Sequence, residues 1–327
     1  AENRRPMPLR ERGGPNKREG RGRMGGLGGL LTEGAAGLPD ETSNPKSHLA
    51  AWITEEENPL TARVIANRLW QYHFGTGLVA TANDFGVNGE EPSHPDLLDY
   101  LANRLIEHDW QLKPIHRLIL LSNTYRQASG SPTTDQANEL DPDNRLLWRF
   151  PRRRLAAEEI RDAMLAVSGE LNHKAHGPSV IVPVDQELVD LLYNPSQWEV
   201  TADEVEYLRR SVYLVAKRNL RLPFMEVFDQ PDLQTSCARR ESSTHAPQSL
   251  ELLNGRLSNT LAEVFARRLH YEASATSQDV VTLAFALTAS RPPSARERAI
   301  ATRFLAENSL REFALAMFNL NAFLYVE

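Results

Sequence analysis

The most reactive side chains of the sequence lie in one stretch, CARRESSTHAPQSLELLNG, which runs from Cys237 to Gly255. It holds the only cysteine of the 327 residues, followed by Arg239, Arg240 and His245. A thiol with an imidazole within hydrogen-bond reach could act as a nucleophile, and two guanidinium groups could stabilise its thiolate. The pattern therefore allows covalent catalysis through Cys237.

The same stretch also has the features of a helix start. Thr244, His245 and Pro247 occupy cap and first-turn positions, and Ser242 and Ser243 could satisfy free backbone amides. This interpretation needs no third catalytic group, whereas a nucleophilic cysteine also needs a residue that orients its base. We therefore favour an architectural role for the stretch.

Two other patterns suggest chemistry that the sequence does not complete. Asp84-Phe85-Gly86 matches a kinase tripeptide, but the phosphate loop, strand lysine and H-R-D loop of a kinase are missing, so we predict a turn. The histidines are scattered, and His173 with His176 is the nearest approach to a chelating pair. Two ligands without a third rarely hold an ion, so we predict no metal and no cofactor.

Arginine-rich segments offer anion binding or ion pairing. Arg63, Asn67 and Gln71 share one helical face, which we interpret as a solvated or ion-paired ridge. WRFPRRRLAAEEIRD places an arginine cluster before several acids. Guanidinium groups could bind phosphate or carboxylate there, but acids one turn later favour an internal ion-pair network.

The elements that must position these residues are mainly helical. Helix-start and helix-stop signals bound a helix between Asn58-Pro59 and Gly75, Ser93 with Asp96 predicts a capping box, and Ser294 with Glu297 predicts another. Apolar periodicity predicts further helices, including one continuous helix through Leu250, Leu253, Leu257, Leu261, Val264 and Leu269.

The fold class is therefore mainly α, an irregular multi-helix fold with a small β element. Two β-rich segments predict short strands near 179–183 and 210–217. We predict four parts: a flexible basic Gly/Arg-rich tail, an N-terminal helical part, a linker, and a C-terminal helical part with the β element, over residues 1–43, 44–130, 131–150 and 151–327.

Composition limits the classes of partner. The net charge is −6; residues 1–23 carry eight basic and three acidic groups, or +5, which leaves −11 for the rest. An acidic body argues against a nucleic-acid partner, and no apolar run is long enough to span a membrane. One cysteine excludes an internal disulfide framework, and it also excludes the C-x-x-C-H motif for haem attachment.

Six motifs together resemble one known family, and the resemblance covers roughly residues 47–327 in order. They include NPLTARVIANRLWQYHFGTGLVATANDFG, WQLKPIHRLILLSNTYRQAS, NRLLWRFPRRRLAAEEIRDAMLAVSGEL, RRSVYLVAKRNLRLPFMEVFDQPD, CARRESSTHAPQSLELLNG and NLNAFLYVE. This chain is similar to the planctomycete domain of unknown function numbered fifteen fifty-three, also called planctomycete surface domain one. Its first 43 residues have no match in that family, and the chain is either a fragment of a longer protein or a stand-alone version.

The resemblance implies a setting but no activity. It implies a periplasmic, cell-surface or secreted protein, because members usually follow cytochrome c-type domains and a companion domain in large exported proteins. We therefore expect a non-catalytic helical interaction or assembly module with a protein partner of the cytochrome c or companion type. The alternative is a hydrolase or anion-binding enzyme acting on extracellular polysaccharide. Its candidate catalytic residues are Asp84, His94, Arg126, Arg152, Cys237 and His245.

Overall fold

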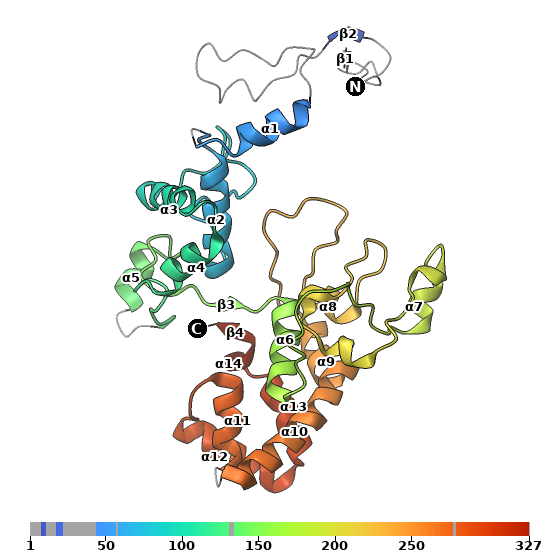
Figure 1. The fold of residues 1–327 in the computed structure, drawn as a ribbon. Coiled ribbons are helices and arrows are strands. Elements are labelled where there is room, and N and C mark those ends of the chain that lie inside the picture. Colours follow the sequence, from blue (N-terminus) through green and yellow to red (C-terminus); the bar gives the residue numbers. More distant parts are fainter. Residues whose placement is uncertain are drawn as a thin grey trace. The chain divides into compact units, whose positions relative to one another are not determined.

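The computed structural model describes residues 8–10, 18–21, 44–56, 58–130, 134–276 and 279–326. The chain divides into two compact units: unit 1 is Ala1–Gln127 with Pro132–Arg149, and unit 2 is Ala128–Ser131 with Phe150–Glu327. Helices dominate both units, which confirms the mainly α class (Figure 1). Over the described ranges, no helix combines the length and apolar character that crossing a membrane requires.

Unit 1 is centred on helix α2, which packs against α3 and α4. The buried side chains between them include Trp70 and Phe74 of α2, which stack at 4.2 Å. Much of the predicted tail, residues 1–43, lies outside the described residues. The elements of unit 1 are β1 (Pro8–Arg10), antiparallel to β2 (Arg18–Arg21), then α1 (Pro45–Ile53), α2 (Thr61–Phe74), α3 (Pro95–Glu107), α4 (Leu112–Leu120) and α5 (Thr134–Leu140), which falls in the predicted linker.

The predicted signals fix both ends of α2. The side chain of Asn58 accepts hydrogen bonds from the amides of Leu60 and Thr61 at 3.0 and 3.2 Å, so it caps the helix although regular helix begins only at Thr61. Gly75 ends the helix with φ of 81°, a left-handed conformation that glycine adopts without a steric penalty.

The prediction of a solvated or ion-paired ridge on α2 was correct for one of its three residues and wrong for the other two, which are buried. Asn67 is fully buried and Gln71 is 7% exposed, whereas Arg63 pairs with Asp99. Asn67 bonds both the N–H and the C=O of Val79, at 2.8 and 3.0 Å. The side-chain amide of Asn67 therefore satisfies both backbone groups of Val79, as a neighbouring β-strand would, and ties the turn after the helix to α2.

Unit 2 is centred on the long helix α10, which packs against α6, α9 and α13 (Figure 1). Phe265 of α10 stacks on Phe318 of α13 at 5.7 Å, and both are fully buried. The elements are β3 (Arg153–Arg154), α6 (Ala157–Ser168), α7 (Gln186–Asp190), α8 (Pro223–Val227), α9 (Ala246–Asn254), α10 (Arg256–Thr276), α11 (Val280–Ala289), α12 (Ala295–Glu307), α13 (Leu310–Phe318), α14 (Asn321–Leu324) and β4 (Tyr325–Val326).

Two sequence predictions for the helices of unit 2 had different outcomes. The capping box of Ser294 with Glu297 is present at the start of α12. The prediction of a single helix after Pro247 was wrong, because the helix is interrupted at Gly255, between α9 and α10. Leu250 and Leu253 are consequently 54% and 45% exposed rather than directed into the core.

The small β element is present, but the predicted strands near 179–183 and 210–217 do not form. Val180 and Leu214 make one parallel bridge, and Ser211–Tyr213 is a 3-10 helix. The ladder stops there because side chains take the neighbouring amides: Ser211 N–H donates to Asp162 at 2.7 Å and Ile181 N–H to Thr201 at 3.0 Å. The strands of unit 2 are instead β3 and β4, which pair antiparallel.

Candidate functional site

The arginine-rich segment enters unit 2 as strand β3, and the strand separates its side chains. Successive strand residues point to opposite faces, so Arg153 reaches Glu159 at 2.9 and 3.1 Å while Arg154 turns toward Asp229. Arg152 lies over the ring of Tyr325 in the paired strand β4, with 4.4 Å from its guanidinium carbon to the ring centre. Three consecutive arginines thus have three different environments.

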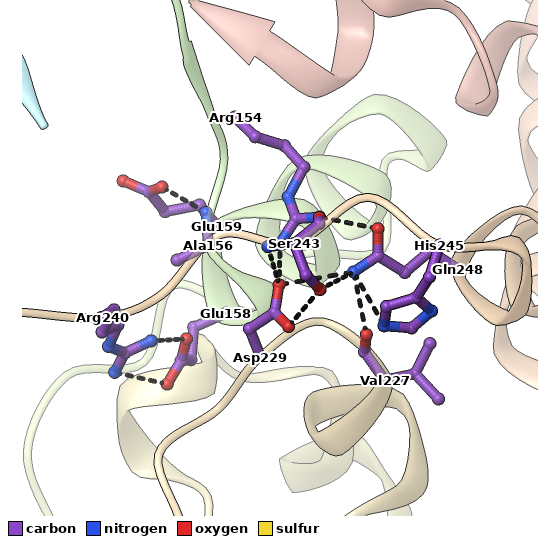
Figure 2. A network of polar contacts seen from close by, with 10 residues as sticks. All are labelled: Arg154, Ala156, Glu158, Glu159, Val227, Asp229, Arg240, Ser243, His245 and Gln248. Atoms are coloured by element: carbon purple, nitrogen blue, oxygen red, sulfur yellow. Dashed lines mark hydrogen bonds and ion pairs between the residues drawn. The ribbon is translucent and has the colours of Figure 1, made fainter.

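Asp229 is the centre of a partly buried polar network (Figure 2). Its carboxylate accepts hydrogen bonds from Arg154, from the hydroxyl of Ser243 at 2.6 Å, and from the amide of Ser243 at 3.0 Å. Burial raises the pKa of Asp229, but the hydrogen bonds from Ser243 and Arg154 outweigh it and leave that pKa below the usual value. Asp229 is therefore held as a carboxylate.

Gln248 joins this carboxylate to the rest of the network. Its side chain, on α9, is 6% exposed. Its carbonyl oxygen accepts from Arg154 at 2.7 Å, and its NH₂ donates to the carbonyl of Val227 at 3.1 Å and to Asp229 at 3.3 Å. Arg154 also donates to the carbonyl of Ser243. The network thus ties β3, the segment after α8 and the start of α9 together.

Two ion pairs flank the network and occupy the acids of the first turn of α6. Arg240 binds Glu158 through two contacts of 2.5 and 2.9 Å, and Arg153 binds Glu159. Burial raises the pKa of each glutamate, but hydrogen bonding to the paired arginine and to backbone amides lowers it by a larger amount. Both pKa values are therefore below the usual value. The negative charges of these glutamates also interact favourably with the positive N-terminal end of the helix dipole. The predicted pairing of the arginine cluster with the acids one turn later is present for Arg153 and Glu159, whereas Arg154 and Glu158 have partners from distant segments.

A second polar framework surrounds two buried arginines. Arg161 donates to the carbonyl of Arg209 at 3.0 Å and to the hydroxyl of Ser211 at 3.1 Å, and burial lowers its pKa to about 10. Arg209 is fully buried, bonds the carbonyl of His176 at 2.5 Å and lies 3.8 Å above the ring of Tyr213. These guanidinium groups are occupied by the protein's own carbonyl groups.

The Asp229 network lacks the order of contacts that activates a serine. Nucleophilic catalysis requires a base that contacts the nucleophile and a third group that orients the base. Here Ser243 donates directly to Asp229, and the imidazole Nε2 of His245 faces the amide of Gln248 at 3.4 Å. No hydrogen bond joins Ser243 to His245 in the described part of the chain. The geometry is that of a structural clasp.

The structure separates Cys237 from the network. Its side chain is exposed, and the thiol donates to the carbonyl of Arg239 at 3.2 Å. His245 occupies the N-cap position of α9 without capping it through its side chain, and Ser243 serves Asp229 instead of the helix amides. The helix start was predicted correctly, whereas the capping role of its hydroxyl groups was not. No contact between Cys237 and His245 occurs in the described residues.

The candidates in unit 1 occupy separate local structures. Asp84 is exposed and accepts from the amide of Gly86 at 2.9 Å, which confirms the predicted turn. His94 caps α3 by position, and its ring contacts the hydroxyl of Ser93 at 3.0 Å, so the predicted Ser93 capping box was wrong. Arg126 is exposed after α4. These three candidates make no contact with one another in the described part of unit 1.

Two histidines that the sequence did not single out as a site do meet in unit 1. His73 Nε2 and His116 Nδ1 lie 2.8 Å apart, and the ring of Tyr125 meets His73 edge to face at 5.6 Å. In the described residues, no group of three or more histidine, cysteine or acidic side chains is arranged to hold a metal ion. The ring of Tyr125 also contacts Phe74, so the two histidines belong to an aromatic cluster.

Two surface hollows differ in chemistry. In unit 2, a hollow of about 630 Å³ beside the end of α6 includes Arg268, which bonds Glu272 at 2.7 Å and the carbonyl of Val167 at 2.8 Å. In unit 1, a groove of about 670 Å³ between α3 and α4 has a mainly apolar lining, which includes Tyr100 and Leu118. We call the second hollow the α3–α4 groove.

Sequence reasoning did not place Ser243 and Gln248 in a common site with Arg154. The arginine lies 89 and 94 positions from these two residues, so no local spacing connects them. The motif FDQPD contains Asp229 and marks a polar turn after α8. In the structure Asp229 has a left-handed φ of 61°, which is uncommon for residues other than glycine.

These observations define a helical protein of two units whose buried polar residues bind one another. A sequence model of the family PSD1, described as protein of unknown function (DUF1553), matches residues 45–305. The chain belongs to this family, which confirms the resemblance drawn from its motifs. No curated protein and no solved structure matches the chain.

Proposed function

We propose that the protein is a non-catalytic helical interaction module that assembles with another protein. The observation that supports this is a contrast between its polar and apolar surfaces. The half-buried carboxylate of Asp229 and the buried arginines of unit 2 are bonded to the protein itself, whereas the α3–α4 groove is open and mainly apolar. Exposed apolar surface with a concave shape is typical of binding sites.

The setting and the kind of partner follow from family resemblance. Members of the family usually occur in exported proteins beside cytochrome c-type and companion domains. The proposed protein is therefore periplasmic, at the cell surface or secreted, and its partner is a cytochrome c-type or companion domain. Neither a nucleic acid nor a prosthetic group is part of the proposal.

Site-directed photo-crosslinking in the producing cell tests this function. A photoreactive amino acid would replace one exposed residue at a time in the full chain, at Val87, Tyr193 or Tyr271, which are 105%, 102% and 76% exposed. We expect one protein to be recovered repeatedly and, once purified, to bind the purified chain directly in calorimetry. Absence of any direct complex, together with polysaccharide hydrolysis by the purified chain that His245→Ala abolishes while the chain stays folded, would establish the enzyme instead.

A further inference from the structure

The α3–α4 groove is formed by a second apolar stripe on each helix. The first stripes pack into unit 1, with Leu105 of α3 fully buried and Ile115 of α4 1% exposed. Residues of the groove lining recur at helical spacing: Leu97, Tyr100 and the buried Leu101 on α3, with His108 directly after it, and Pro114, Arg117 and Leu118 on α4, with Leu121 directly after it. Trp70 of α2 also contributes to the lining. Both helices therefore carry more apolar surface than the fold itself buries.

The groove is open to solvent. Tyr100, Leu118 and Leu121 are 42%, 38% and 62% exposed. Ser122 and Thr124 also line the groove and supply polar groups. A mainly apolar surface that includes an aromatic side chain and a few polar groups is typical of a protein-binding surface.

The charge at the groove is basic. Arg117 and His108 are the ionisable side chains of the lining apart from the Tyr100 phenol, and no carboxylate lines it. Two acids of α3 have partners elsewhere: Asp99 pairs with Arg63, and Glu107 pairs with Arg104. A ligand that carries carboxylates beside its apolar groups would therefore complement the lining.

We propose that the α3–α4 groove binds an amphipathic helix of a partner protein that carries carboxylates beside its apolar face. The inference deepens the proposed function, on which it rests, because it names the surface and the chemistry of the partner. A helix places side chains at i, i+3, i+4 and i+7 along one face, which suits an apolar groove lined by two helices. Carboxylates at the edge of that face would meet Arg117 and His108.

The test uses full-length protein and three labelled helical peptides of about 18 residues, or five turns. The first has a stripe of leucines flanked by glutamates, the second has the same leucines flanked by lysines, and the third keeps the glutamates but replaces the leucines by glutamine. Fluorescence anisotropy measures their affinities. We expect the leucine–glutamate peptide to bind about tenfold more tightly than either of the others, as for an interface that depends on a few anchors.

Variants locate the binding. Leu118→Asp should weaken the leucine–glutamate peptide by about tenfold or more, because it puts a charge among the apolar anchors. Arg117→Glu should reverse the preference toward the lysine peptide. The matched control is Val87→Asp, which adds the same charge as Leu118→Asp at a residue of unit 1 that is fully exposed and outside the groove. Circular dichroism and melting of each variant separate lost binding from lost folding.

Several outcomes would overturn the inference. They are equal affinity for the glutamate and lysine peptides, loss of binding in Val87→Asp, concentration-dependent dimerisation that Leu118→Asp abolishes, and adsorption to anionic phospholipid vesicles that Leu118→Asp abolishes. If the photo-crosslinked partner binds Leu118→Asp as tightly as the unaltered chain, the interaction module stands and the groove is not its surface. If no partner complex exists but the peptides bind as expected, the proposed function fails, and only the preference of the groove for an acidic amphipathic helix stands.

Discussion

Replacing Arg154 with methionine tests whether the Asp229 network holds unit 2 together. The side chain of Arg154 is 6% exposed, and its loss leaves Asp229, which is 17% exposed, without its cation. Breaking a buried ion pair by removing one partner costs about 3–5 kcal/mol. Asp229 keeps both hydrogen bonds from Ser243, so we expect a smaller loss, about 2–4 kcal/mol.

Hydrogen exchange of the full chain measures this loss where it occurs. Exchange measured in peptides covering residues 223–255 reports on the local stability of α8 and α9. A global unfolding measurement would average this local effect over both units. A loss of that size corresponds to roughly 30-fold to 1,000-fold faster exchange of the amides that open with the network. Arg153→Met is the matched control, because it removes the same charge from a neighbouring but more exposed pair and should cost less than about 1 kcal/mol.

The pH dependence provides an independent check on the same network. The folded pKa of Asp229 is below its unfolded value of 3.8, so its contribution to stability is present above pH 3.8 and is lost as the pH falls through the folded pKa. The stability gap between the unaltered chain and Asp229→Asn should therefore be constant near neutral pH and shrink in acid. If Arg154→Met changes exchange no more than Arg153→Met, or if the gap widens in acid, the network does not stabilise the unit as described.

Three further predictions concern other positions. Gly77→Ala should destabilise unit 1 by about 1–3 kcal/mol, because an added Cβ would lie 2.6 Å from Asn67, whereas Gly130→Ala, with nothing within 4 Å, should be neutral in the same melting experiment. Glu297→Gln should reduce protection at the start of α12 by up to about 1 kcal/mol at neutral pH. Its arginine partner lowers the pKa of Glu297 from 4.5 to about 2, so the effect should hold above pH 4.5 and vanish toward pH 2 in exchange measurements corrected for intrinsic rates. Exposed Cys237 should react with iodoacetamide in the folded protein at about the rate of the urea-unfolded chain, and protection of more than about tenfold would contradict its placement.

Local signals in the sequence predicted local structure well. Asn58, Gly75 and the Ser294 capping box marked true helix ends, because caps are satisfied by residues within one turn. The periodicity through Leu250 failed, because a helical pattern continued across Gly255 while the backbone did not. Spacing alone carries no information on a break at which both flanking segments are helical.

The candidate site could not be predicted in the same way. Arg154 was identified as part of an ion-pair network, but its partners depend on which distant segments the fold brings to β3. A buried glutamine such as Gln248 has no periodic signature, and its two hydrogen-bonding ends are used only after three segments have met. The chemical types of the site could therefore be predicted from the sequence, whereas their pairing is determined by the tertiary structure.

The pairing of β3 with β4 affects when unit 2 can finish folding during synthesis. Arg153 pairs with Val326, so nearly the whole unit separates the two strands along the chain. A ribosome that has made α6 and α10 has released helices that can pack, but it cannot yet supply the partner of β3. Contacts between such distant residues form slowly, because a long loop must close first. During that interval Arg154 of β3 can already reach Asp229 and Gln248, so the polar clasp can hold the strand in place before its partner emerges.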